Sequence, residues 1–192
     1  VSLPWMSESG HNQTEPSGPL GPVNRILVVK WSAMGDVAMA TAVMEDLRRA
    51  LPDAVIDLNT LPAYTGLFAE DERFNRVFAV DLRGKDRGWR GARKWLSEVK
   101  SGRYDVVFDF QSNDRSWSLF ALWRLSSFRV PAFVGHHKRF PYRFAPPKQK
   151  EPPRGVDGLR RMLAEVGIEA KLPCPVIGIS AKRVDKVNQL LA

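Results

Sequence analysis

Apolar and polar positions first form a clear pattern at residue 25, where an apolar run, a polar turn and a helical periodicity follow one another. Residues 26–29 are apolar throughout, which is typical of a strand buried on both faces of a parallel sheet. After a turn over residues 32–35, apolar residues recur at the spacing of one helix face, at Val37, Ala40, Met44, Leu47 and Leu51. The pattern predicts a strand, a loop and a helix, with Asp36 at or beside the helix N-terminus.

The same two periodicities predict further elements along the chain. Short apolar runs predict strands at residues 54–58, 76–80, 104–110, 131–134 and 176–179. Helical spacing predicts a short helix within 61–70, a helix with Ala92, Trp95, Leu96 and Val99 on one face, and a helix from 156 that Gly167 closes. Residues 116–125 are apolar nearly all round, so we expect a helix that is deeply packed or covered by another surface. The basic segment 81–95 predicts a mobile loop that enters a helix, and the proline-rich segment 135–154 predicts a loop.

Strands that alternate with helices predict an α/β fold with a doubly wound, mostly parallel, Rossmann-like sheet. A strand-helix-strand unit makes a right-handed crossover between parallel strands, so Asp36 should lie at the carboxyl edge of the sheet. Ligands of such sheets bind beyond this edge. We expect the loops that carry Asp36, residues 83–90, residues 111–115 and residues 136–139 to meet there.

The length of 192 residues suits one well-buried domain, which we place at residues 24–180 after a disordered leader at residues 1–23. No apolar run approaches the roughly 18 residues of a membrane helix, and the N-terminal segment lacks the pattern of a signal peptide. The single Cys174 offers neither a disulfide framework nor a metal cluster. We therefore expect a soluble protein of a reducing cytoplasm.

The net charge of +8 is concentrated in two regions. Residues 83–103 and residues 138–161 each hold eight Lys and Arg against two acidic residues. Such surfaces suggest a polyanionic partner, which would be a phosphorylated lipid, an acidic sugar or a nucleic acid. Two solvated loop faces are the structural alternative.

Several chemistries are disfavoured by the motifs. Gly35 stands alone after the first strand, where a dinucleotide site needs three spaced glycines, and no phosphate-binding loop motif occurs. Ser32 lacks the sequence surroundings of a nucleophile elbow. Neighbouring His136 and His137 in an extended loop would point apart, which argues against a metal pair. From spacing alone, Asp36 is equally well explained as a simple N-cap of its helix.

Three segments resemble a known family. ILVVKWSAMGDVAMATAVMEDLRRALPDAVIDL, YDVVFDFQSNDRS and RGVDGLRRMLAEVGI are similar to the N-terminal half of the family 9 glycosyltransferases, the ADP-heptose:lipopolysaccharide heptosyltransferases. The resemblance spans about residues 24–180. It implies a GT-B architecture, in which the first of two doubly wound domains binds the acceptor and the second mainly binds the nucleotide sugar. Residues 181–192 would then begin an interdomain linker, and the chain would be an acceptor-side half without its C-terminal donor domain, inactive alone.

The resemblance also implies roles for individual residues. Asp36 matches the family's aspartate proposed as the catalytic base, which takes the proton of the acceptor hydroxyl while ADP leaves with inversion. The residues that would bind the acceptor are Ser32, Gly35, Arg83, Lys85, Arg87, Gln111, Arg115, Lys138 and Arg139. For Gln111 and Arg115, a purely structural role remains an equal alternative. The implied donor is ADP-heptose as a substrate, with no cofactor and no metal.

The implied acceptor is an anionic glycolipid that resembles Kdo on lipid A, which implies a cytoplasmic protein that touches the inner face of the cytoplasmic membrane. This sequence departs from the family pattern at Trp31, Ala33, Ser112, Arg154 and Gly158, which puts the acceptor in question. A non-catalytic basic module that binds nucleic acid or an anionic membrane is the rival hypothesis, with Trp89 and Trp95 available to stack on bases. The enzyme hypothesis expects no nucleic-acid partner.

Overall fold

A five-stranded, all-parallel sheet forms the centre of the computed structural model, which describes residues 19–81, 84–151, 153, 155–178 and 188–190. The strand order is β3-β2-β1-β4-β5. The elements are β1 (Arg25–Val29), α1 (Met34–Ala50), β2 (Val55–Thr60), the 3₁₀ turn η1 (Pro62–Leu67), β3 (Arg76–Ala79), α2 (Trp89–Ser101), β4 (Val106–Asp109), α3 (Asp114–Leu125), β5 (Ala132–Val134) and α4 (Asp157–Ala164). The predicted α/β fold with a doubly wound parallel sheet is confirmed.

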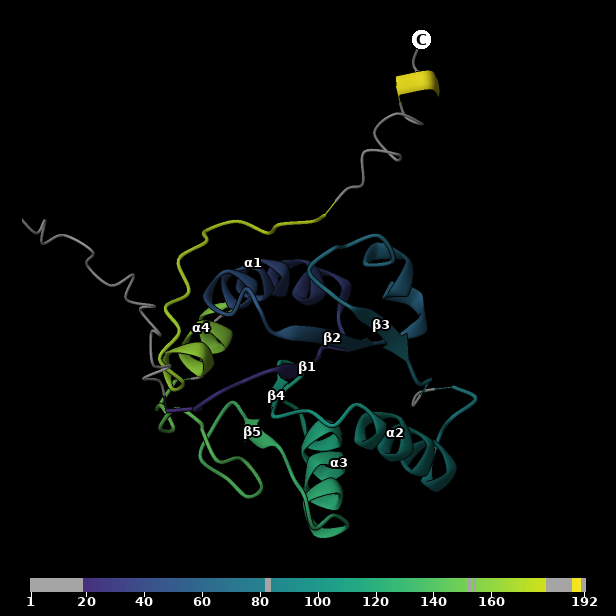
Figure 1. Cartoon of the computed structure of the whole chain (residues 1–192), viewed down its shortest axis with the longest axis vertical. Coiled ribbons are helices and arrows are strands. Elements are labelled where there is room, and N and C mark those ends of the chain that lie inside the picture. The colour runs from purple at the N-terminus through teal and green to yellow at the C-terminus, as the bar shows by residue number, and fades with distance from the viewer. Residues whose placement is uncertain (1–18, 82–83, 152, 154, 179–187, 191–192) are drawn as a thin grey trace, which may run out of the picture.

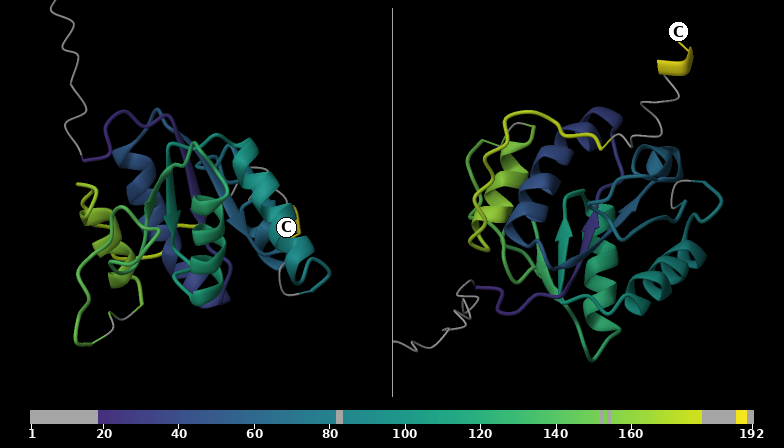
Figure 2. Two further views of the ribbon diagram at one scale, coloured as in Figure 1. Left: turned by 90° about the horizontal axis from the view of Figure 1, so that it is seen from below. Right: turned by 45° about the horizontal axis from the view of Figure 1, so that its top comes forward.

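Helices cover both faces of this sheet. Helices α1 and α4 lie on one face, and α2 and α3 lie on the other (Figure 1). The right view of Figure 2 shows the same separation. Successive side chains of a strand point to opposite faces, so Ile26 and Val28 join the core under α1 and α4, while Leu27 and Val29 join the core under α2 and α3. The continuous apolar run at residues 26–29 follows from this two-sided burial.

The central strand positions the candidate site. β1 pairs with β2 on one side and with β4 on the other, and Val29 lies opposite Asp109 at the end of the second pair. The chain leaves β1 for α1 and leaves β4 for α3, which lie on opposite faces of the sheet. The loops after these strands therefore diverge at the carboxyl edge, which creates the crevice where ligands of such folds bind.

Two predicted elements differ from the structure. α2 begins at Trp89, so the second half of the predicted mobile loop at 81–95 is helical, and residues 82 and 83 lie outside the described ranges. The predicted strand at 176–179 is wrong for its described residues 176–178, which belong to no sheet. The backbone of Val176 bonds to side chains instead: its N–H donates to the Thr41 hydroxyl over 2.9 Å and its carbonyl accepts from Arg73 over 2.8 Å.

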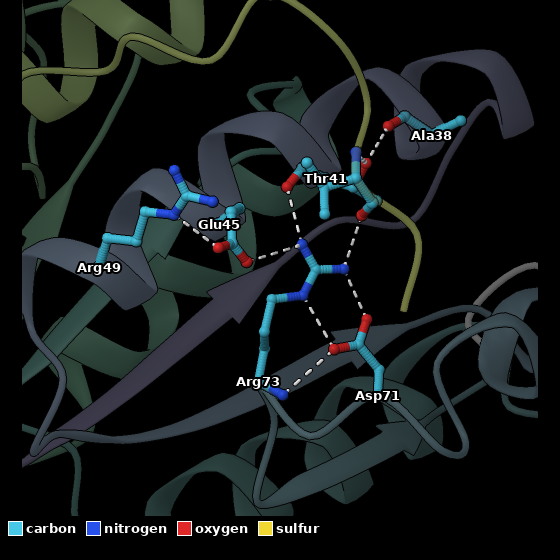
Figure 3. A network of polar contacts seen from close by, with 7 residues as sticks. Ala38, Thr41, Glu45, Arg49, Asp71 and Arg73 are labelled. Carbon is cyan, nitrogen blue, oxygen red and sulfur yellow. Dashed lines mark hydrogen bonds and ion pairs between the residues drawn. The ribbon is translucent and has the colours of Figure 1, made fainter. Parts of the chain in front are cut away.

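The segment after α4 is fixed to α1 by polar side chains. The carboxylate of Asp46 accepts from the backbone N–H groups of Lys171 and Leu172. Further along, buried Arg73 bonds to Asp71 through two nitrogens at 2.8 and 2.6 Å and to the carbonyl of Thr41 at 3.0 Å (Figure 3). This network joins the loop before β3, the helix α1 and the C-terminal segment.

The termini of the predicted domain lie partly outside the described residues. Of the predicted leader at 1–23, residues 1–18 are not described, while Leu20 and Val23 pack against the core under α1. Of the predicted linker start at 181–192, the structure describes only residues 188–190. Among the described residues, no helix combines the length and the apolar character needed to cross a membrane.

Candidate functional site

A pocket opens at the carboxyl edge of the sheet, where the loops after β1 and β4 diverge. It has a volume of about 230 Å³. Its lining comes from the end of β1, the first turns of α1, the loop after β4, the loop after β5 and the start of α4, and it consists of Lys30, Asp36, Met39, Ala40, Phe110, Gln111, Ser112, His136, Gly155, Val156, Gly158 and Leu159. We refer to it as the switch-point pocket.

Asp36 stands in the first turn of α1 and is solvent-exposed. Its carboxylate accepts a hydrogen bond of 3.3 Å from the backbone N–H of Ala33, which closes the turn before the helix. Ala33 is the N-cap of α1 and Asp36 stands at the third helical position, so the interpretation of Asp36 as the N-cap residue is wrong. Its carboxylate supports the cap from inside the first turn and also lines the switch-point pocket.

Gln111 fixes the loop that leads to Asp36. Its Oε1 accepts hydrogen bonds from the backbone N–H groups of Trp31 at 2.8 Å and of Ser32 at 3.0 Å. Its Nε2 donates to the hydroxyl of Ser32 at 3.3 Å. One amide side chain from the loop after β4 therefore orients the loop after β1, which favours a positioning role for Gln111. The indole N–H of Trp31 donates in turn to Asn59 at 2.8 Å, so the loop is held on both sides.

Lys30 is the buried cation of the pocket. It follows β1 directly and is only 7% exposed. Burial lowers the pKa of its ammonium group, and the negative charges of Asp36 and Asp109 oppose that shift. A cation that lines a pocket can bind an anionic group, and the negative charges of Asp36 and Asp109 offset part of its attraction.

A buried polar network lies behind the pocket. The carboxylate of Asp109 is fully buried, and burial raises its pKa, while its hydrogen bonds oppose the shift. It accepts from Tyr142 at 2.5 Å, from Ser116 at 2.8 Å and from the backbone N–H groups of Ser112 and Gln111 at 3.0 and 3.2 Å. These bonds fix the start of the loop that presents Gln111.

His136 enters the pocket against the start of α4. Burial lowers the pKa of its imidazole, and the neighbouring His137 and Arg161 add to the shift. A Cβ added at Gly158 would lie 2.7 Å from the His136 ring, so glycine allows this close approach. The glycine that departs from the family pattern at 158 therefore accommodates the histidine. No group of three metal-ligating side chains occurs within the described ranges.

The predicted acceptor-binding residues do not all meet in this pocket. Gln111 lines it, Ser32 is joined to it through Gln111, and Gly35 sits exposed beside Asp36 with open space where a side chain would point. Arg87 and Arg115 line a separate cavity of about 470 Å³ between α2 and α3.

The remaining predicted cations lie at other places. Arg139 stacks over Trp117 at 3.6 Å and lies 3.5 Å from Asp114, in a cavity of about 240 Å³ that shares Ser112 and His136 with the switch-point pocket. Lys138 is exposed in the same loop, and the backbone N–H of Lys85 donates to Asp81. Arg83 lies outside the described residues. The expected convergence of all four loops is therefore only partial.

Four residues of the site were not predicted for it. Lys30, Asp109 and Tyr142 were not among the candidates, and His136 was named only as a disfavoured metal ligand and as part of the loop 136–139. A lysine directly after four buried apolar residues was the visible signal for Lys30, because a strand end in a parallel sheet faces the ligand edge. Tyr142 gave no such signal, because its contact with Asp109 joins residues 33 positions apart.

Solved structures that are similar to this chain include glycosyltransferases. A family 9 glycosyltransferase from Veillonella parvula is 19% identical, with a TM-score of 0.71 over 86% of this chain and 48% of that chain. The E. coli ADP-heptose LPS heptosyltransferase II is 17% identical, with a TM-score of 0.60 over 88% of this chain and 50% of that one. The E. coli heptosyltransferase WaaC with ADP-2-deoxy-2-fluoro heptose is 22% identical, with a TM-score of 0.53 over 77% and 50%. The sequence matches no protein-family model and no curated protein.

These likenesses establish the fold. The predicted resemblance to the family 9 glycosyltransferases and the heptosyltransferases is confirmed at the level of structure. The chain spans about half the length of each of these proteins.

Proposed function

We propose that this chain is the acceptor-side half of a family 9 glycosyltransferase that transfers a heptose from ADP-heptose to a lipopolysaccharide core acceptor. The observation that carries the proposal is the place of Asp36. In a glycosyltransferase fold, this carboxylate is exposed at the switch-point pocket, on a loop that Gln111 holds in position. A general base must be open to substrate, and the exposed carboxylate of Asp36 meets this requirement.

In the proposed reaction, Asp36 acts as the base. A hydroxyl of the acceptor attacks the anomeric carbon of the heptose, and its proton passes to the Asp36 carboxylate as the new C–O bond forms. The bond from the anomeric carbon to the diphosphate breaks on the opposite face, so ADP leaves and the configuration inverts. General-base assistance is expected to contribute about 10²- to 10⁴-fold to the rate.

The cations around the pocket would bind an anionic acceptor that resembles Kdo on lipid A. Lys30 provides a buried positive charge inside the pocket, and Arg139 borders it through the shared Ser112 and His136. Arg87 and Arg115 stand farther along the same edge of the sheet and offer guanidinium groups for phosphates or carboxylates. Lys85, Lys138 and Arg83 are proposed to extend this acceptor surface. A lipid-borne acceptor would bring the protein to the cytoplasmic face of the membrane.

The nucleotide sugar would bind mainly to a second half. This proposal is supported by the comparison, because the chain spans about half of proteins that include a heptosyltransferase solved with ADP. Residues 181–192 would lead toward that half, and the chain alone would bind acceptor but transfer little heptose.

The proposal is tested by supplying the chain with a nucleotide-sugar-binding half of a family 9 glycosyltransferase, then measuring ADP release from ADP-heptose with and without Kdo-lipid A. We expect acceptor-dependent release only when both halves are present. Nuclear magnetic resonance of the chain alone should show that the acceptor shifts the amides around Asp36 and Gln111. An acceptor that shifts none of these amides would contradict the assignment of the acceptor side.

A further inference from the structure

A groove beside α3 combines exposed apolar side chains with arginines. Arg124, Phe128, Phe140 and Arg143 line one cavity of about 510 Å³ along the edge strand β5. Leu125 ends α3 and follows Arg124 in the sequence, and Arg129 follows Phe128 in the connection from α3 to β5. Phe128 is fully exposed, Leu125 is 76% exposed and Phe140 is 52% exposed. We call this surface, formed by Arg124, Leu125, Phe128, Arg129, Phe140 and Arg143, the Arg-Phe groove.

The exposure of these side chains is not explained by the packing of the chain. α3 was expected to be deeply packed or covered by another surface, and its residues Leu119, Phe120 and Trp123 are indeed buried. Leu125 ends the same helix with its side chain in solvent. Large apolar residues that are exposed together, with polar residues around them, mark a surface that binds a partner.

The charge around the groove defines the chemistry of that partner. Residues 115–150 contain eight Lys and Arg and no Asp or Glu. Lys100 adds a ninth cation, because its Nζ donates to the carbonyl and the hydroxyl of Ser126 at 3.1 and 2.9 Å. The nearby Asp105, whose carbonyl accepts from Ala132, uses its carboxylate to accept from the N–H groups of Asn24 and Arg25. The surface is therefore positive and apolar together.

We infer that the Arg-Phe groove docks on an anionic phospholipid bilayer. Phe128, Leu125 and Phe140 would enter the boundary between headgroups and acyl chains, and the three arginines of the groove would contact lipid phosphates. Arginines and aromatic side chains can also bind a nucleic acid, but an exposed leucine adds nothing to such binding. The composition of the groove therefore fits a bilayer better than a nucleic acid. The groove adjoins the cavity that holds Arg139, because Tyr142 lines both, and that cavity shares Ser112 and His136 with the switch-point pocket. Docking there would place lipid-borne molecules beside the switch-point pocket.

The inference stands apart from glycosyl transfer and is tested without it. The chain is co-sedimented with phosphatidylcholine vesicles, with and without phosphatidylglycerol, at physiological ionic strength. The parent chain should bind only the anionic vesicles. Phe128→Ser with Arg129→Gln should weaken this binding about 20-fold or more, since one arginine contributes about fivefold and a buried phenylalanine side chain about tenfold.

A matched control separates the groove from net charge. Trp89→Ser with Arg90→Gln removes one exposed aromatic residue and one cation from α2, away from the groove, so this variant has the same net charge as the test variant. It should bind within about twofold of the parent chain. Leu125→Ser with Arg124→Gln provides a second test variant at exposed positions, and circular dichroism verifies that each variant is folded.

Four results would overturn the inference. The first three are equal binding to neutral and anionic vesicles, equal loss in the control and the two groove variants, and a parent dimer in light scattering that the groove variants dissociate. The third result would assign the groove to a second copy of the chain. Tighter binding to single-stranded nucleic acid than to vesicles, lost in the same variants, would also contradict it.

Discussion

Replacing Gln111 with Leu should release the loop that presents Asp36. The substitution keeps a side chain of similar size but removes the oxygen that accepts from Trp31 and Ser32 and the amide that donates to the Ser32 hydroxyl. Leaving one buried N–H group unpaired costs about 1–3 kcal/mol. Trp31 is 2% exposed and bears the full cost, whereas Ser32 is half-buried and can be partly hydrated. We therefore expect a loss of about 2–4 kcal/mol in the free energy of unfolding.

Two measurements check this value. Urea unfolding followed by tryptophan fluorescence gives the loss in stability, and hydrogen exchange should show the Trp31 and Ser32 amides exchanging about 10- to 100-fold faster. Gln111→Glu is the matched variant, because a carboxylate still accepts from both N–H groups, and it should stay within about 1 kcal/mol of the parent chain. Unchanged stability together with unchanged protection of the two amides in Gln111→Leu would refute the positioning role.

Three further predictions concern the buried charges. Arg73→Met should cost about 3–5 kcal/mol in urea unfolding, because it leaves Asp71 buried without its partner, whereas Arg49→Met at the exposed pair with Glu45 should cost less than about 1 kcal/mol. Tyr142→Phe removes a hydrogen bond that lowers the pKa of Asp109, which burial raises above 3.8. A raised carboxyl pKa makes stability fall as the pH rises through that pKa, and Tyr142→Phe should raise the pKa further. The loss in the free energy of unfolding of Tyr142→Phe should therefore grow with pH, and a loss independent of pH would contradict this prediction. Because the folded protein lowers the pKa of Lys30, the free energy of unfolding should rise as the pH increases toward 10.5. Lys30→Met should flatten this rise, and unfolding curves over a series of pH values measure it.

The strands and helices of the fold could be predicted because the spacing of apolar residues within each segment indicates its secondary structure. The run at residues 26–29 predicts a strand buried on both faces, and the spacing from Val37 to Leu51 predicts a helix that begins near Asp36. The structure confirms both, and it confirms the parallel pairing that brings the ends of β1 and β4 together. Such predictions succeed where burial repeats with the period of the element.

The contacts that complete the site could not be predicted in this way. Gln111 bonds to a loop 79 and 80 positions away, and no local pattern indicates which carbonyl or amide a side chain reaches. The segment at 176–178 has apolar residues typical of a strand, yet its hydrogen bonds go to the side chains of Thr41 and Arg73. The charge count likewise indicates how many cations a region holds but not the directions in which they point, so the cations that were expected at one edge occupy separate cavities.

The role of Asp36 as the base is tested most directly by the rate of heptose transfer for Asp36→Asn in the assay with both halves. Asparagine can still accept from the Ala33 N–H group, so the cap of α1 is retained and stability should change by less than about 1 kcal/mol. We predict that kcat falls about 10²- to 10⁴-fold while the KM for the acceptor changes little. Equal kcat values for the parent chain and Asp36→Asn would contradict the account.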